Sequence, residues 1–189
     1  MSGFSSKKTP APVALTGTPG TGKSAVGRAL GSRYRVAEVG ELAIDLGAGR
    51  RRGGDIGVDL AALRRTLRHT PPERLPQVLV GHLSHLLPVR DAVLLRCHPI
   101  ALDARLRRAR RGTAMQRRAN VEAESTDLIL LEALAAGLRV WEIDTTHRSP
   151  SETAHAVDQL LRRRPPPSFG EVDWLADPRV TDYLLRRTR

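Results

Sequence analysis

The sequence lacks the features that secreted, disulfide-stabilised and membrane-spanning proteins require. Its single cysteine, Cys97, excludes a disulfide within the chain and is typical of a protein from a reducing compartment. No apolar run approaches the roughly 18 residues that cross a membrane, and residues 1–12 contain no hydrophobic signal core. We therefore expect a cytoplasmic protein without a membrane segment.

Aromatic residues are scarce as well. They make up 3% of the 189 residues, whereas 40% of the residues are hydrophobic, so the core must be mainly aliphatic. A chain of this length is typical of one domain and is long enough to bury such a core.

Lysine is rare among the basic residues. The chain has 31 lysines and arginines and a net charge of +11, yet only Lys7, Lys8 and Lys23 are lysines. Outside the N-terminal tail, lysine thus remains only at position 23, where a compact ammonium group is favoured over a broad guanidinium. The net charge indicates polyanionic partners such as nucleotides or RNA; a surface of solvated arginines is the alternative.

Residues 17–24 form the strongest motif of the chain. They read Gly-Thr-Pro-Gly-Thr-Gly-Lys-Ser, which fills every fixed position of the phosphate-binding pattern G-x-x-x-x-G-K-[ST] between a predicted strand and a predicted helix. In such a loop the lysine, here Lys23, reaches the β- and γ-phosphates of ATP, and the hydroxyl of Ser24 binds Mg²⁺. The expected nucleotide-binding residues are Gly20, Thr21, Gly22, Lys23, Ser24 and Ala25.

Alternating strand and helix patterns predict an α/β fold, a five-stranded parallel sheet with helices on both faces. In such folds ligands bind at the carboxyl ends of the strands. Glu41, His82 and Arg96 follow or end predicted strands and are therefore site candidates. The predicted strands are 13–17, 36–39, 77–81, 91–96 and 138–144, and the predicted helices run from the glycine loop to 33 and over 41–46, 58–69, 99–111, 120–136 and 150–164, with a loop at 47–57.

The domain organisation follows from composition. Residues 1–12 are small and polar and predict a disordered tail. Residues 13–164 form the predicted domain, and three prolines at 165–167 begin a C-terminal extension over 165–189. This extension carries Phe169, Trp174 and Tyr183, which predicts that it docks on the domain or on a partner.

Six segments of residues 13–163 together resemble one family, the atypical adenylate kinases of the isoenzyme 6 type, in their archaeal form. In eukaryotes that family also acts in maturation of the small ribosomal subunit. The segments are 17–24, 39–43 (Val-Gly-Glu-Leu-Ala), 81–88 (Gly-His-Leu-Ser-His-Leu-Leu-Pro), 94–99 (Leu-Leu-Arg-Cys-His-Pro), 120–124 (Asn-Val-Glu-Ala-Glu) and 142–146 (Glu-Ile-Asp-Thr-Thr).

The resemblance implies a nucleoside monophosphate kinase fold of three layers, with a monophosphate-binding segment at about 38–63 and a small helical lid at about 108–120. It implies the reaction ATP + AMP = 2 ADP with Mg²⁺, accompanied by slower ATP hydrolysis. His82 matches a histidine linked to catalysis in the family; a capping or core histidine is the alternative. Seven arginines lie in or beside the lid, at 105, 107, 108, 110, 111, 117 and 118. Arg111 matches the lid arginine that contacts phosphate, and Asp59 matches an acidic position of the monophosphate segment. With Glu41 and Arg96, Asp59 completes the expected substrate-binding set.

The chain departs from the family pattern at one position that bears on the metal. Val80 stands where the family has an acidic residue two positions before the histidine, so Mg²⁺ binding would rest on Ser24 and the nucleotide phosphates. A second function remains open, that of an ATP-dependent assembly factor that binds a small-subunit ribosomal protein and rRNA. The net charge and the arginines at 50–52 favour it.

Overall fold

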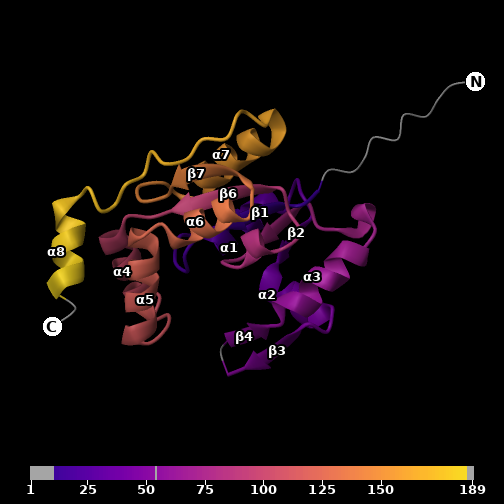
Figure 1. Ribbon diagram of the computed structural model, residues 1–189, viewed down its shortest axis with the longest axis horizontal. Coiled ribbons are helices and arrows are strands. Elements are labelled where there is room, and N and C mark those ends of the chain that lie inside the picture. Colours follow the sequence, from indigo (N-terminus) through magenta and orange to yellow (C-terminus); the bar gives the residue numbers. More distant parts are fainter. Residues whose placement is uncertain (1–10, 54, 187–189) are drawn as a thin grey trace, which may run out of the picture.

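The computed structural model describes residues 11–53 and 55–186, so the disorder predicted for residues 1–12 lies outside the described residues except at positions 11 and 12. A five-stranded sheet in the order β2-β5-β1-β6-β7 forms its centre, and all the pairings are parallel. The predicted α/β fold is therefore confirmed (Figure 1). The strands are β1 (Val13–Thr16), β2 (Val36–Glu38), β5 (Val78–Val80), β6 (Asp91–Arg96) and β7 (Arg139–Asp144).

Two aliphatic clusters cover the two faces of this sheet, because successive side chains of a strand point to opposite faces. Ala14, Leu79 and Leu94 belong to one cluster, which packs against α2, α3 and α6. Val13, Val78 and Val93 belong to the other, which packs against α1 and α7. The helices are α1 (Lys23–Leu30), α2 (Val39–Asp45), α3 (Leu60–His69), α4 (Pro99–Arg108), α5 (Ala114–Ser125), α6 (Leu128–Ala135), α7 (Pro150–Arg163) and α8 (Pro178–Arg186), with 3₁₀ turns η1 (Pro72–Arg74) and η2 (Ser84–Leu86).

The prediction of a loop at 47–57 is wrong, because most of this segment forms an antiparallel hairpin of β3 (Gly49–Arg52) and β4 (Asp55–Val58). The arginine and glycine content hides this pairing, which tertiary contacts stabilise. A Cβ atom on Gly49 would lie 2.8 Å from the backbone nitrogen of Ile44, and one on Gly40 would lie 3.1 Å from Ile56. Close packing against α2 thus holds the hairpin.

The single helix predicted at 120–136 is also wrong. Two helices, α5 and α6, replace it, and they are separated at Thr126 and Asp127. Asp127 has a φ of 55°, in the left-handed region, and its carboxylate accepts a hydrogen bond from Arg96. Helix α5 begins earlier than predicted because Thr113 and Gln116 form a capping box. The ends of the other predicted elements differ by up to three residues from those observed.

The C-terminal segment lies on the domain. Ser168 forms a parallel bridge with Trp141, and Val180 of α8 is fully buried. Figure 1 shows the segment running from α7 along the sheet to α8, which contacts α4. Among the described residues, no helix combines the length and the apolar character needed to cross a membrane.

Candidate functional site

The phosphate loop adopts a conformation that only glycine permits. Gly17, Gly20 and Gly22 have φ values of 137°, 101° and 99°. A Cβ atom on Gly17 would lie 2.3 Å from the carbonyl oxygen of Leu95, and one on Gly20 would lie 2.7 Å from a methyl group of Leu102. The loop therefore packs tightly against β6 and α4 and leads directly into α1, whose N-cap is Gly22.

Lys23 lies buried at the first turn of α1. The residue is 8% exposed, and its Nζ donates a hydrogen bond of 2.9 Å to the carbonyl oxygen of Thr18 within the same loop. Burial lowers the pKa of Lys23 to about 8, although Glu124 and Glu38 oppose this shift. The ammonium group is thus poorly solvated, and an anion beside it would relieve this cost.

A pocket of about 390 Å³ opens at the carboxyl ends of β1, β2 and β5. It gathers four cationic side chains, those of Lys23, Arg28, Arg105 and Arg111, and one carboxylate, that of Glu38. This excess of positive charge suits a polyanionic ligand such as a nucleotide phosphate chain. The other lining residues are Pro19, Gly20, Gly22, Ser24, Ala25, Gly81, His82, Leu106 and Ala109.

Most of the predicted site residues meet in this pocket. Gly20, Gly22, Lys23, Ser24, Ala25, His82 and Arg111 line it. Thr21 is buried beneath the loop, and its hydroxyl donates to the carbonyl oxygen of Thr18. A second cavity of about 250 Å³ lies on the other side of the loop, where Thr21, Arg105 and Arg148 are among its lining residues.

His82 and His85 differ in their surroundings. Both ring nitrogens of His85 are engaged, by the Thr16 hydroxyl and by Glu132, and the residue is buried, as expected for a structural histidine. His82 faces the pocket, where desolvation, followed by the positive charge of Lys23 and by His85, lowers its pKa. The lowered pKa favours the neutral form of the His82 ring, which can accept a hydrogen bond from a ligand.

Two predicted substrate-binding residues lie outside the pocket. Glu41 is on the exposed face of α2, where Arg51 of the hairpin donates to it at 2.6 Å. Asp59 caps α3 by accepting a hydrogen bond of 2.9 Å from the backbone N–H of Ala62. Both positions are occupied by local structural contacts in this conformation.

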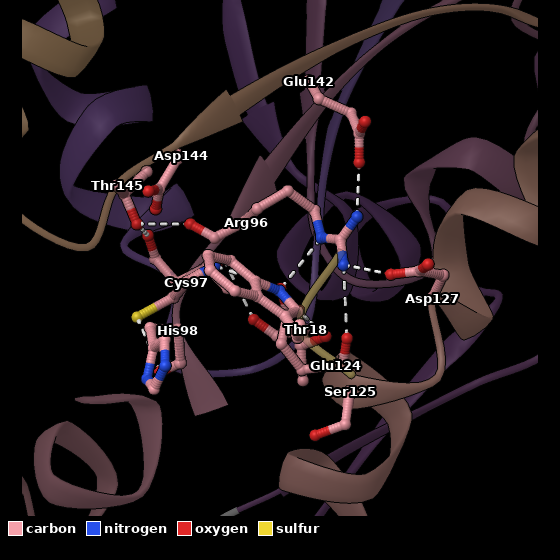
Figure 2. A network of polar contacts seen from close by, with 12 residues as sticks. Thr18, Arg96, Cys97, His98, Glu124, Ser125, Asp127, Glu142, Asp144 and Thr145 are labelled. Carbon is pink, nitrogen blue, oxygen red and sulfur yellow. Dashed lines mark hydrogen bonds and ion pairs between the residues drawn. The ribbon is translucent and has the colours of Figure 1, made fainter. Parts of the chain in front are cut away.

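Arg96, the third, is 1% exposed and lies at the centre of a buried charge cluster (Figure 2). Its Nε donates to Glu124 at 2.9 Å, and its two terminal nitrogens donate to Glu142 and Asp127. Burial opposes the charge of Arg96, but these carboxylates raise its pKa above the ordinary value. The guanidinium is thus held by protein groups, and Arg96 does not line the pocket, although we expected it to bind substrate there.

Of the seven arginines in or beside the predicted lid, Arg105 and Arg111 line the pocket. Arg105 also donates to the carbonyl oxygens of Thr145 and Thr146, at 2.7 and 3.0 Å, which fixes its direction. Arg107 and Arg118 pair instead with acidic residues one helical turn away.

Sequence reasoning missed three of the polar lining residues. Glu38 ends β2 and is a site candidate by the rule of strand carboxyl ends, whereas Glu41, three residues later, lies on α2 and outside the pocket. Arg28 lies four residues after Ser24, one turn along α1, and helical spacing was the available signal. Arg105 was counted among the lid arginines, but its place in the pocket depends on the tertiary contacts to Thr145 and Thr146.

Comparisons with known proteins agree with this geometry. Residues 13–127 match the model of a family described as "AAA domain". A protein of Thermococcus onnurineus is 39% identical over 177 residues, which cover 92% of this chain and 97% of the relative. One of Archaeoglobus fulgidus is 40% identical over 184 residues, covering 92% and 98%, and one of Halobacterium salinarum is 37% identical over 180 residues, covering 91% and 99%. All three carry the name "Putative adenylate kinase".

These relatives cover nearly the whole chain, and the family model covers the phosphate loop and the sheet strands up to β6. The chain therefore belongs to the P-loop kinase family of these archaeal adenylate kinase homologues.

Proposed function

We propose that the protein transfers the γ-phosphoryl group of ATP to AMP and forms two ADP, with slow ATP hydrolysis as a side reaction. The observation that carries this proposal is the convergence of the phosphate loop, Lys23, Arg105 and Arg111 on one pocket. Phosphoryl transfer needs positioning and positive charge rather than a covalent intermediate, and this pocket offers both. The names of the relatives point to the same reaction.

In the proposed reaction an oxygen of the AMP phosphate attacks the γ-phosphorus of ATP. The bond from that phosphorus to the β–γ bridging oxygen breaks, and ADP leaves with the electron pair. Lys23 holds the β- and γ-phosphates, while Arg105 and Arg111 stabilise the charge on the transferring group. Residues 20–25 supply backbone N–H groups at the start of α1, where the helix dipole also favours an anion.

The base of ATP fits the second cavity on this proposal. That cavity shares Gly20, Gly22 and Arg105 with the phosphate pocket, so one extended molecule can occupy both. Thr145 and Arg148 also line it. The first pocket then keeps room for the acceptor phosphate next to Glu38 and His82. Glu41 and Asp59 stay predictions as acceptor-binding residues.

The residues present fit Mg²⁺ bound together with the nucleotide. Ser24 lines the pocket directly after Lys23, so its hydroxyl is the group that would hold the ion. When bound, Mg²⁺ neutralises negative charge on the β- and γ-phosphates. The side chain of Val80 is fully buried beside Gly27 of α1 and offers no oxygen. Metal binding therefore depends on the hydroxyl and on the phosphates.

The proposed reaction is tested by measuring ADP formation from Mg-ATP with and without AMP, with Lys23→Met as the blank. A rate that rises strongly with AMP supports the nucleotide kinase. A slow rate that AMP does not change overturns the proposed kinase reaction and favours an ATPase switch.

The second candidate function is that of a ribosomal assembly factor. The exposed arginines of β3 support it, since basic strands of this kind suit RNA phosphates.

We expect His82→Ala to lower the rate of ADP formation at least about tenfold, equivalent to about 1.4 kcal/mol of transition-state stabilisation. The reason is that the variant removes a pocket-lining imidazole that, on this proposal, accepts a hydrogen bond from the bound substrate. The matched control is His69→Ala, on the outer face of α3, where the ring contacts only its own helix in the described contacts. An unchanged rate in His82→Ala would return His82 to a structural role.

A further inference from the structure

The C-terminal segment reaches the phosphate loop through a single buried carboxylate, that of Glu124. This side chain of α5 accepts hydrogen bonds from the Thr18 hydroxyl at 2.6 Å and from the backbone N–H of Cys97 at 3.0 Å. It also accepts from Arg96 at 2.9 Å and from the indole N–H of Trp174 at 3.1 Å. Four parts of the chain thus meet at one group: the phosphate loop, the end of β6, α5 and the C-terminal segment.

Trp174 covers this carboxylate from the C-terminal side. The guanidinium carbon of Arg96 lies 5.9 Å from the centroid of the indole ring, within cation–π range. The ring of His98 meets the indole edge to face, with centroids 5.3 Å apart and an interplanar angle of 77°. The indole therefore shields the Arg96–Glu124 pair from water on this side, which strengthens the hydrogen bonds beneath it.

The rest of the segment holds Trp174 in place. Before it, Ser168 pairs with β7 by two backbone hydrogen bonds, of 3.1 Å to Val140 and 3.0 Å from Glu142. After it, Asp177 contacts the ring of His98 at 3.2 Å, and the Tyr183 hydroxyl donates to the carboxylate of Asp103 on α4. The indole is thus fixed from both ends and not only by its own contacts.

Thr18 connects this cluster to the catalytic lysine. Its side chain is held by Glu124, while its carbonyl oxygen accepts the hydrogen bonds from Lys23 and from the Thr21 hydroxyl. Glu124 thus contacts the same residue whose carbonyl oxygen holds the ammonium group of Lys23. Figure 2 shows Thr18, Glu124 and Arg96 in this arrangement.

From these contacts we infer that Trp174 is a positioning residue for ATP: through Glu124 and Thr18 it holds the phosphate loop in its binding conformation. The C-terminal segment is on this view a working part of the nucleotide site rather than an appendage. The inference rests on the proposed function only in that the phosphate loop binds Mg-ATP.

The test is a double-mutant cycle on the dissociation constant of Mg-ATP, measured by calorimetry. Trp174→Phe keeps a ring over the cluster but removes the N–H donor, and we expect it to raise the dissociation constant about fivefold. Glu124→Gln alters the group that holds Thr18 and should raise the dissociation constant of Mg-ATP further. Because both act through one contact, Trp174→Phe should add little in the Glu124→Gln background. Wild-type affinity in Trp174→Phe, or effects that add, would overturn the inference.

Tyr183→Phe is the matched control. It removes a hydroxyl that anchors the same segment on Asp103 but leaves the indole N–H bond to Glu124 in place, so Mg-ATP affinity should fall clearly less than in Trp174→Phe. An equal loss in this variant would mean that loosening the segment in any way weakens binding, which contradicts a specific role for Trp174. Failure of the wild-type chain to bind Mg-ATP would overturn the proposed function, and this inference with it.

A fluorescence measurement tests the inference without changing Trp174. The chain has two tryptophans, and Trp141→Phe leaves Trp174 as the only one. Filling the phosphate loop should then change the emission of Trp174, because its N–H partner also holds Thr18. Emission that stays unchanged at saturating Mg-ATP would contradict the connection.

Discussion

Replacing Lys23 with methionine is expected to abolish ATP turnover and, at neutral pH, to make the nucleotide-free protein more stable. The loss of turnover follows from removing the ammonium group beside the phosphate loop, which no other cation of the pocket can replace at that point. The gain in stability follows from burial. The pKa of Lys23 falls from 10.5 to about 8, which corresponds to roughly 3 kcal/mol of unfavourable free energy for the charged form.

The sign of the pH dependence follows from proton binding. Between pH 8 and 10.5 the unfolded chain keeps the proton on Lys23, whereas the folded chain has released it. The free energy of unfolding of the wild type should therefore rise with pH over this range, relative to that of Lys23→Met. Urea unfolding of both proteins at pH 7 and pH 9.5 measures this difference, in which the other titrating groups cancel.

Lys23→Arg separates charge from shape. It keeps the positive charge but places a broad guanidinium where Nζ contacts the carbonyl oxygen of Thr18, so we expect it to be inactive as well. Substantial turnover in Lys23→Arg would mean that charge alone is sufficient. Equal pH dependence of unfolding in the wild type and Lys23→Met would show that Lys23 is not desolvated in the free protein.

The parts of the site that could be predicted from sequence are those that local chemistry determines. The glycines at 17, 20 and 22 have positive φ values that other residues rarely adopt, so the loop can be predicted from the sequence alone. Strands β1, β5 and β6 are short, fully buried and mostly aliphatic, and the sequence predicts their bounds to within a residue. Parallel strands then bring His82 to the same edge as the loop.

The parts that were missed depend on contacts between distant segments. Neither proline nor glycine lies near Asp127 to break a helix, and the break accompanies a contact with Arg96, 31 residues earlier. The arginines of β3 have no strand pattern, and the hairpin depends on packing against α2. Arg96 itself ends a strand beside the site, as a substrate-binding residue would. Only its three carboxylate partners distinguish it from one.

Because Arg96 pairs with three carboxylates, we expect Arg96→Met to lose much of its stability. The variant leaves Glu124 and Glu142, both almost fully buried, without the cation that pairs with them. Breaking a buried ion pair from one side typically costs about 3–5 kcal/mol, out of a total stability of about 5–15 kcal/mol. We therefore expect a folded but strongly destabilised protein, measured as a shift of the urea midpoint.

Arg139→Met provides the control for this prediction. Arg139 also pairs with a buried carboxylate, that of Asp91, but its side chain is half exposed, and Asp91 keeps a second partner in Arg164 at 2.9 Å. The loss of stability in Arg139→Met should therefore be much smaller than in Arg96→Met.

Adding Glu142→Gln to Arg96→Met should recover part of the lost stability, because it removes one of the charges left unpaired. Wild-type stability in Arg96→Met would mean that water or a rearranged side chain solvates these carboxylates, and that the cluster does not hold α5 and β6 together. In that case the connection from Glu124 to the phosphate loop would lose its physical basis as well.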